Sequence, residues 1–325
     1  MSLRALLASL FLLGCAMVPR EASAAIACFL VGTRPALTFG TVVGSPTPQV
    51  DVATRATVGC LSDEGVVNAK VCLKLSAGSP DTSLLPTRRM ANGAARLNFQ
   101  VTRDTARAQV FGEGGGAAPM EGIVRANTPW FFGWFYGELA FDFYGRVPAG
   151  QLAVPRGAYA SDMTLTVTGG VTSNASCNAL NNVQDSEPVQ ATATVAASCT
   201  IAANPLNFGT VNVLTANVNA ATSLGLNCTT GAPWTIRMNG GTVTGNVAGR
   251  RMGAGGAGPG VINYELRHTS PTGPLWGDGT AGTTVLTGTG TGSSQTIGVF
   301  GRVPGGQPAP PVGTYSDTVT VSVEF

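Results

Sequence analysis

The chain has 325 residues, of which 44 are glycine and 20 are proline, whereas only 11% are charged. This composition excludes long amphipathic helices and predicts an all-β protein of many short strands joined by tight turns. The 19 Lys and Arg nearly balance the 17 Asp and Glu, and the two lysines, Lys70 and Lys74, belong to no basic run. Nucleic acid is therefore excluded as an expected partner, because phosphate binding needs a clustered positive field.

Residues 1–24 have the features of a signal peptide. Arg4 supplies a positive start, "ALLASLFLLGCAMV" an apolar stretch, and Ala22-Ser23-Ala24 a small-x-small cleavage site before Ala25. Removal of this segment leaves 17 basic and 16 acidic residues. An alternative interpretation takes "LLGC" as a lipobox, in which Cys15 would be acylated and would anchor the protein to a membrane.

Two halves of the chain repeat one another in order. "CFLVGTRPALTFGTV" from Cys28 matches "CTIAANPLNFGTV" from Cys199, and "YGRVPAGQ" in the first half matches "FGRVPGGQ" in the second, 156 positions later. The repeating unit is far longer than the 20–50 residues of a solenoid, so the pattern indicates a duplicated domain. We expect an N-terminal domain over 25–170, a polar linker over 171–187 and a C-terminal domain over 188–325.

The strands of each copy alternate in polarity. In "TYSDTVTVSVEF", apolar side chains from Tyr315 to Phe325 fall on one face, whereas threonine, serine and Glu324 fall on the other. This period of two is typical of a strand with one buried face. Several such strands separated by Gly/Pro turns predict a β-sandwich in each half.

Six cysteines follow the expected cleavage site, and an even number in a secreted chain predicts disulfides. The pair that recurs in both copies predicts the bridges Cys28–Cys60 and Cys199–Cys228. Cys72 and Cys177 remain, and we pair them by elimination.

The motifs of the second half resemble the spore coat protein U domain. They run in the order Phe208-Gly209, Arg250-Arg251-Met252, "WGDG" from Trp276, "GRVPGGQ" and "GTYSDTVTVSVEF". The first half matches at Cys28, Phe39-Gly40, Cys60, the Arg-Arg-Met and "YGRVPAGQ". It departs in two places, since Tyr159 and Asp162 are one residue further apart than Tyr315 and Asp317, and "WGDG" has no clear counterpart.

The resemblance implies a fold and an assembly mechanism. Most secreted relatives look like subunits of archaic chaperone–usher pili, with immunoglobulin-like, pilin-type sandwiches that lack one strand. A periplasmic chaperone fills the open groove first, and a neighbouring subunit's N-terminal strand then replaces it at the outer-membrane usher. We expect the C-terminal domain to lack a strand that such a donor supplies, and the protein to be exported through the periplasm to the cell surface.

Donor-like sequence is distributed unequally between the two copies. "PVQATATVAASC" before Cys199 alternates, with Val189, Ala191, Ala193 and Val195 on one face. Before Cys28 only residues 25–27 follow the expected cleavage site, and three residues span about 10 Å. The sequence therefore predicts a subunit that accepts a strand but donates none, as expected of a tip adhesin. It leaves open whether 189–198 completes the first domain or begins the second.

An aromatic run in the first domain is the candidate adhesive surface. "PWFFGWFY" places six rings in seven positions, more than one buried strand face accepts. The run consists of Trp130, Phe131, Phe132, Trp134, Phe135 and Tyr136. One interpretation is an exposed loop that binds apolar surfaces, either abiotic or on a host. The other is a strand buried on both faces. Val42-Val43-Gly44 and Ile123-Val124 are secondary candidates for the same surface.

No enzyme is expected, and neither a cofactor nor a metal. His268 is the one histidine, and no GxSxG motif accompanies it. One histidine and six paired cysteines leave no zinc ligand set. The Arg-Arg-Met and GRVP motifs occur in both copies, which indicates a shared structural role. The sequence thus predicts a fimbrial tip adhesin for attachment and biofilm formation. The alternatives are a shaft or minor pilin subunit and a surface lipoprotein without an adhesive role.

Overall fold

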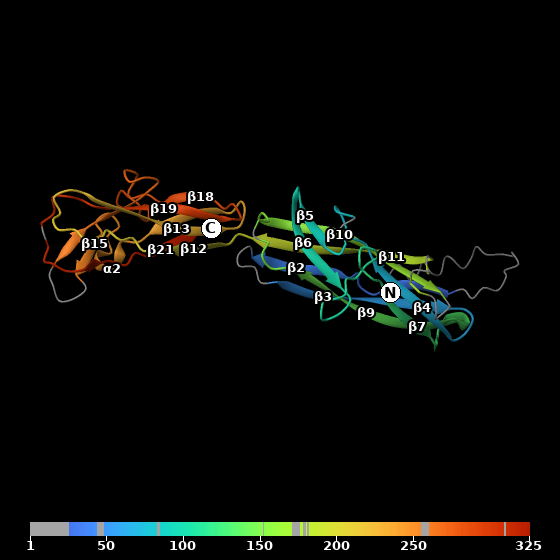
Figure 1. Cartoon of the computed structure of the whole chain (residues 1–325). Coiled ribbons are helices and arrows are strands. Elements are labelled where there is room, and N and C mark those ends of the chain that lie inside the picture. The colour runs from blue at the N-terminus through green and yellow to red at the C-terminus, as the bar shows by residue number, and fades with distance from the viewer. Residues whose placement is uncertain are drawn as a thin grey trace.

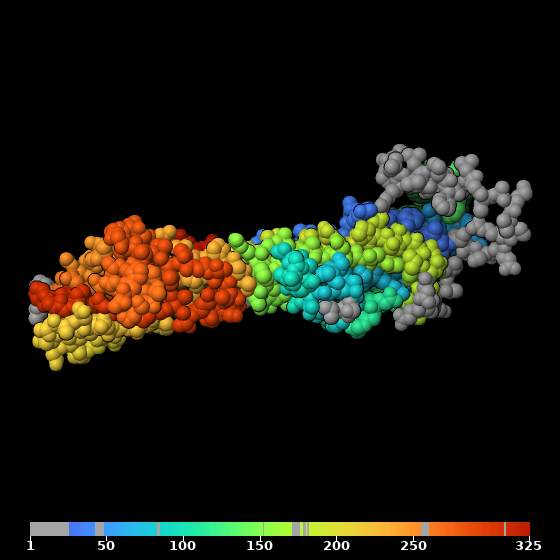
Figure 2. All heavy atoms as spheres, turned by 90° about the horizontal axis from the view of Figure 1, so that it is seen from above, coloured from blue at the N-terminus to red at the C-terminus, as the bar shows by residue number. Residues whose placement is uncertain are grey.

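The computed structural model describes residues 26–43, 49–82, 85–151, 153–170, 176–177, 180, 182–254, 260–308 and 310–325. The expected signal peptide, its cleavage site and Cys15 lie outside this set. In the described residues the chain forms two β-sandwich units placed end to end as a rod (Figures 1 and 2). Their described helices are each about one turn long, and none is long and apolar enough to cross a membrane.

The described residues of the first unit form eleven strands and one short 3-10 turn. They are β1 (Ile26–Val31), β2 (Ala36–Val43), β3 (Val50–Ser62), β4 (Val67–Leu75), β5 (Arg88–Asn92), β6 (Ala95–Thr102), β7 (Met120–Ala126), β8 (Thr128–Pro129), η2 (Phe131–Gly133), β9 (Phe135–Val147), β10 (Gly157–Gly170) and β11 (Val183–Ala196).

In the second unit, the residues that the structure describes form ten strands and one helical turn. They are β12 (Cys199–Ala203), β13 (Val218–Cys228), β14 (Pro233–Met238), α2 (Gly241–Thr244), β15 (Arg251–Ala254), β16 (Val261–Asn263), β17 (Glu265–His268), β18 (Leu286–Thr289), β19 (Ser294–Val303), β20 (Tyr315–Ser316) and β21 (Val321–Glu324).

Two layers of strands enclose the core of the first unit. One layer has the order β1-β3-β9, with β8 also paired to β9, and the other has the order β7-β4-β10-β11-β2. The hairpin β5–β6 joins the layers, because β5 pairs with β10 while β6 pairs with β9. Alternation along β10 places Tyr159, Met163, Leu165 and Val167 in the core.

The donor-like segment is part of the first unit. β11 runs antiparallel to β10 from Val183 to Val195 and parallel to β2 on its other side. Its alternating apolar side chains, Val189, Ala191, Ala193 and Val195, are all buried in the first core. The open question from the sequence is thus answered: the segment completes the first sandwich. Residues 183–187 of the expected linker over 171–187 already belong to β11. The pairing of β11 with β10 continues through residue 188 without a break, so it marks no domain boundary there.

The second unit repeats this plan without the completing strand. Its sheets have the orders β12-β13-β19-β17, β18-β14-β21 and β16-β15-β20. β21 pairs with β14 on one side, and no described strand pairs with its other side. We call this side the open edge. Residues 205–213, which correspond to β2, form no strand within the described part.

The structure corrects the alignment of the two halves. β10 pairs with β4, and β21 pairs with β14, through corresponding residues. The offset of 156 residues that relates Tyr159 to Tyr315 therefore holds to the end of both strands. Asp317 therefore corresponds to Ser161, not Asp162, and both side chains face a glycine of positive φ, Gly241 or Gly78. The two segments thus differ by a substitution, serine for aspartate, and not by an inserted residue.

The "WGDG" motif also has a counterpart, which the sequence comparison missed. Phe111 and Trp276 are both buried, and each makes a parallel bridge seven or eight residues ahead, to Ala118 and Thr284. The segment "FGEG" from Phe111 therefore takes the place of "WGDG". A phenylalanine replaces the tryptophan in the core of the first unit.

The Arg-Arg-Met motifs have the structural role that their recurrence predicted. Arg88 is completely buried, and its guanidinium donates to the carbonyls of Leu75, Ser76 and Phe111. Burial lowers the pKa of Arg88 to about 10. Arg250 makes the matching bonds to Met238, Asn239 and Trp276. The arginine thus ties a strand end to the FGEG or WGDG turn.

All three predicted disulfides are present: Cys28–Cys60, Cys72–Cys177 and Cys199–Cys228. The first and third join paired residues of neighbouring strands, β1 with β3 and β12 with β13. The second closes a loop of 105 residues in sequence separation. Three formed bridges fit a protein that folds in an oxidising compartment.

Candidate functional site

The aromatic run forms the turn of a hairpin between β8 and β9. Thr128 and Pro129 pair with Tyr136 and Phe135, and η2 closes the turn between them. The Trp130 amide donates to the Trp134 carbonyl at 2.6 Å, which fixes the turn at its base. We call residues 128–136 the aromatic hairpin.

The six rings divide into an exposed and a half-buried group. Trp130, Phe131 and Phe132 are 54%, 73% and 92% exposed, whereas Trp134, Phe135 and Tyr136 are half-buried. Neither sequence interpretation was therefore complete, because three rings face solvent and three pack on the sandwich. Further along β9, alternation returns, and Phe141 and Phe143 are buried.

Contacts between rings hold the exposed group in place. The ring centroid of Trp130 lies 5.1 Å from that of Tyr136 and 6.3 Å from that of Phe131. The ring centroids of Phe131 and Phe132 are 6.3 Å apart. Offset and edge-on arrangements at these distances are favourable. The Tyr136 hydroxyl donates to Glu138, and burial together with this bond raises the pKa of Tyr136. The rings therefore form a connected row from the sandwich out to Phe132.

Two glycines and one strained residue shape this hairpin. A Cβ on Gly59 would lie 2.6 Å from the Tyr136 hydroxyl, and a Cβ on Gly137 would lie 2.0 Å from the Arg125 carbonyl. Both positions therefore need the absence of a side chain. Phe132 has a φ of 56°, an uncommon conformation for a bulky residue. Such strain at an exposed ring is typical of functional sites.

The exposed rings lie at the end of the rod farthest from the second unit. Strand register places Ser62, Ala126, Phe135 and Val183 at this end, which we call the distal end, whereas Ala196 leads into the second unit (Figure 1). The described large apolar side chains of the first unit that are exposed all lie at or near the distal end. They are Val66, Ile123, Trp130, Phe131, Phe132 and Val183.

The secondary candidates gave a mixed result. Ile123 is half exposed near the distal end, but Val124 is buried in the core. Val42 is also buried, and it pairs with Val195 near the second unit, at the wrong end for such a surface. The side chain of Val43 and Gly44 lie outside the described set. Sequence reasoning missed Val66 and Val183, for which an apolar residue beside a predicted turn or linker was the only signal.

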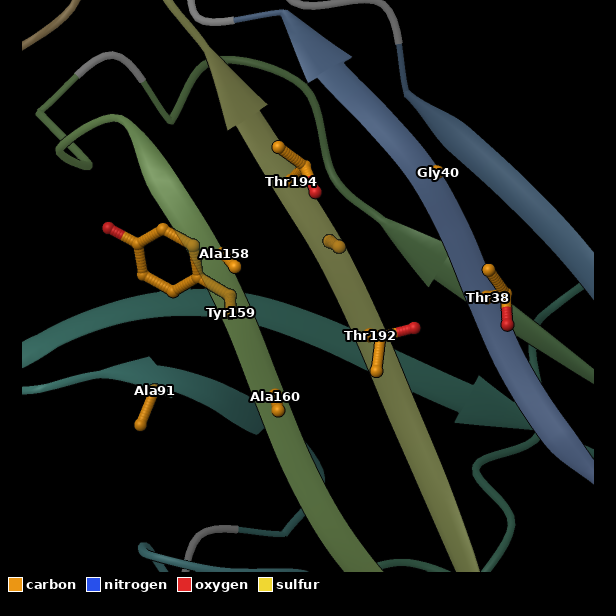
Figure 3. A pocket seen from close by; sticks show the side chains of 9 residues that line it. Thr38, Gly40, Ala91, Ala158, Tyr159, Ala160, Thr192 and Thr194 are labelled. Atoms are coloured by element: carbon orange, nitrogen blue, oxygen red, sulfur yellow. The ribbon is translucent and has the colours of Figure 1, made fainter.

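The first unit also has a shallow hollow of about 260 Å³ on the outer face of its larger layer (Figure 3). Small side chains of β2, β5, β10 and β11 line most of it, among them Thr38, Ala91, Ala158, Ala160, Thr192 and Thr194. Tyr159 is the one titratable residue in the lining, and its hydroxyl donates to the Pro155 carbonyl. The hollow thus offers no acid, base or nucleophile arranged for catalysis.

The lone histidine has a structural environment. His268 is mostly buried, with its two ring nitrogens 2.9 Å and 2.8 Å from the hydroxyls of Thr269 and Thr284, and its ring is edge-on to Trp276. Burial lowers the pKa of His268, so the neutral imidazole is favoured. Within the described residues, no cluster of three or more His, Cys, Asp or Glu could hold a metal ion.

The open edge of the second unit is the other candidate site. Tyr315, Val319, Val321 and Val323 are half-buried. Their counterparts Tyr159, Met163, Leu165 and Val167 in β10 are buried, and β10 has β11 paired alongside it. The half-exposed apolar face and the unpaired side of β21 together leave a sheet edge to which one further strand could pair.

Comparisons with known proteins agree with this architecture. The model of the Spore Coat Protein U domain matches residues 15–168 and 185–322. No curated protein matches the chain. Among solved structures, a chain of the CsuC–CsuE chaperone–tip adhesion subunit pre-assembly complex, from archaic chaperone–usher Csu pili of Acinetobacter baumannii, is 19% identical. The match covers 92% of this chain and 100% of that chain, with a TM-score of 0.51, so the two share a fold.

A second solved structure is more distant. The CupB6 tip adhesin from Pseudomonas aeruginosa is 9% identical, with 93% of this chain and 95% of that chain covered and a TM-score of 0.37. The family match is the stronger finding, because it covers both halves in the order that the repeat predicted. The chain belongs to the Spore Coat Protein U domain family.

Proposed function

We propose that this protein is the tip adhesin of an archaic chaperone–usher fimbria. In this proposal it is exported to the cell surface, its distal end attaches to apolar surfaces, and its second unit joins it to the next subunit. The shared fold with a chain from a chaperone–tip adhesion subunit complex supports this, as does membership of the family. The observation that carries the adhesive role is the exposure of Phe131 and Phe132 at the distal end.

The second unit receives its missing strand from the neighbouring subunit. β11 serves as the template, since it fills the same position in the first unit by main-chain pairing along β10 with small apolar side chains facing inward. An incoming strand would run antiparallel to residues 315–324 and would cover Val319, Val321 and Val323. Before assembly, a periplasmic chaperone would protect this edge, because an unpaired apolar edge promotes aggregation.

The exposed rings provide enough apolar area for attachment. An aromatic side chain that leaves water buries on the order of 100–200 Å², worth about 2–5 kcal/mol at about 25 cal/mol per Å². Three such rings on one hairpin give an upper limit several times larger, before the cost of association. No ion pair or basic patch is needed, so binding would depend little on salt.

A triple substitution of Trp130, Phe131 and Phe132 to Ser tests this role, with the same positions changed to Leu as the matched control. All three side chains are exposed, so both variants should fold and enter fibres. We expect the Ser variant to lose retention on polystyrene by at least about tenfold, while the Leu variant keeps most of it, because apolar area drives binding. Equal retention of the Ser variant and the unchanged protein in fibre-bearing cells would instead support a structural subunit.

A further inference from the structure

We propose that residues 304–308 and 310–313, the described part of a loop at the free end of the second unit, are the docking surface for the next subunit of the fibre. The partner is a homologous domain, which would contact this loop through the turn that follows its second family cysteine. This inference rests on the proposed function, since it concerns the same assembly step.

The first unit has the same loop, and the structure shows what it contacts. Gln151 accepts from the Asn98 amide at 2.7 Å, and Gln307 accepts from the Asn263 amide at 2.8 Å. In both loops the glutamine amide also donates to the carbonyl of that asparagine and to a loop proline. The described residues of the loop 148–157 and of the loop 304–313 therefore share these hydrogen bonds.

A tyrosine closes each of these loops in the same manner. The Tyr159 hydroxyl donates to the Pro155 carbonyl at 2.6 Å, and the Tyr315 hydroxyl donates to the Pro311 carbonyl at 2.7 Å. The next residue in each loop is therefore held at an equivalent position. It is Arg156 in the first unit and Val312 in the second.

Within the chain, the first loop docks on the second unit. The Thr230 hydroxyl donates to the Ala153 carbonyl at 3.1 Å, and the Arg156 amide donates to the Thr230 carbonyl at 3.4 Å. These contacts use the backbone of the loop, so they do not depend on arginine at position 156. They place the turn of residues 228–230 against the end of the first unit.

The docking turn is fixed to the donated strand. Only residues 197 and 198 separate β11 from β12, and the Thr229 amide donates to the Ser198 carbonyl at 2.9 Å. Cys199 and Cys228 are also joined by a disulfide. A domain that donates its strand in this manner necessarily brings its turn to the receiver's loop, so strand insertion and loop docking form one contact.

Among the described residues, none occupies the equivalent surface of the second unit. Val312 is fully exposed, and Val243 and Val261 at the same end are also exposed. They form one region, because Val243 lies against Gly253, which pairs with Val261, and Gly260 packs on Tyr315 and Pro311. Apolar residues concentrate here, where a fibre would place its next subunit.

The relation between the two units is head-to-tail, and such contacts propagate into filaments instead of closing. Cys228 corresponds to Cys60, so Thr230 corresponds to Ser62 at the distal end of the first unit. Each domain thus has one end for the preceding domain and one for the following domain. Within the described residues, the end for the preceding domain is occupied in the second unit and the end for the following domain is occupied in the first.

Site-specific photo-crosslinking tests the docking surface in assembled fibres. The photoreactive residue p-benzoyl-phenylalanine replaces Val312 in the full chain, which is produced with its chaperone, usher and pilins. Two further variants carry it at Arg156, whose adduct should lie within the chain at residues 229–231, and at Ser294, an exposed residue at the opposite end of the second unit. Sheared fibres are irradiated, and adducts are mapped by mass spectrometry.

We expect the Val312 variant to shift to the mass of an adduct with the adjoining subunit, mapped to the few residues after that subunit's second family cysteine. The Ser294 variant should lack this adduct. If the chain is present in fibres and the Arg156 adduct forms, but Val312 gives no adduct, or one elsewhere or with a second copy, the docking surface is wrong while the proposed function stands. Absence of the chain from fibres would overturn both.

Discussion

Substitution of Val189 by Asp tests whether β11 is an integral strand of the first unit. Val189 has no exposed surface and lies in the middle of β11, opposite Met163 of β10. Removal of a buried valine costs about 1.5–3 kcal/mol, and an ionised carboxylate in its place costs several kcal/mol more. A domain is stable by about 5–15 kcal/mol, so the first unit would be close to unfolding.

Thr194→Asp is the matched control, because it adds the same charge to the same strand on its exposed outer face. Its free energy of unfolding should change by less than about 1 kcal/mol. Hydrogen exchange resolved by peptide is the assay. In the Val189→Asp variant the amides of β4 and β10 should lose protection, whereas those of β13 and β19 in the second unit should keep it.

Two results would refute this reasoning. If the Val189→Asp and Thr194→Asp variants exchange alike, then β11 contributes little to the first core. If protection is lost in the second unit but kept in the first, then the segment belongs to the second domain in solution.

Three further predictions concern residues of known environment. His268 is the one histidine, so a single imidazole signal in a proton NMR titration should give a midpoint below its ordinary value of about 6.5. Its contribution to folding stability is present above pH 6.5 and is lost as the pH falls through the lowered pKa, whereas a midpoint at or above 6.5 would contradict burial. Arg88→Met should lower the free energy of unfolding by about 2–5 kcal/mol in urea, since three carbonyls lose a donor while the cost of burying the charge is removed; no change would show that solvent satisfies them. Gly137→Ala should lower the thermal midpoint of the first unit, because the new Cβ collides with the Arg125 backbone. Gly133→Ala should lower the midpoint less, because its Cβ meets open space and only the positive φ of this position adds strain.

The sequence predicted the features that depend on local pattern. Strand alternation, the duplicated plan and the pairing of cysteines such as Cys28–Cys60 all follow from residues whose spacing is visible along the chain. The alignment of Ser161 with Asp317 could not be read in this way, because the repeat places a serine where the family motif has an aspartate, while a neighbouring Asp162 offers a false match. Only the pairing of β10 with β4 resolves the register.

The candidate site was predicted in part for a similar reason. Period two explains why six rings cannot share one face, but it cannot state which rings face solvent once the strand is interrupted. The interruption at η2, with Phe132 at positive φ, determines that division. Val42 shows the converse error, since an apolar pair beside a glycine looks like a loop, whereas Val42 is a buried residue of β2 paired with Val195 of β11.

Residues 205–213 of the second unit form no strand, whereas the corresponding β2 does. The cause is the missing partner strand more than the sequence of residues 205–213. Leu206 and Phe208 pack where a Cβ on Gly301 would lie, as Leu37 and Phe39 do beside Gly145. Gly209 also has a positive φ of 76°, like Gly40 at 66°. The segment thus already has the side-chain packing and the backbone turn of β2, yet only β2 forms a strand, since only β2 lies beside β11. The second unit lacks the main-chain pairing with a completing strand. An incoming strand would meet a segment that is already preorganised, so little conformational entropy would be lost in ordering it.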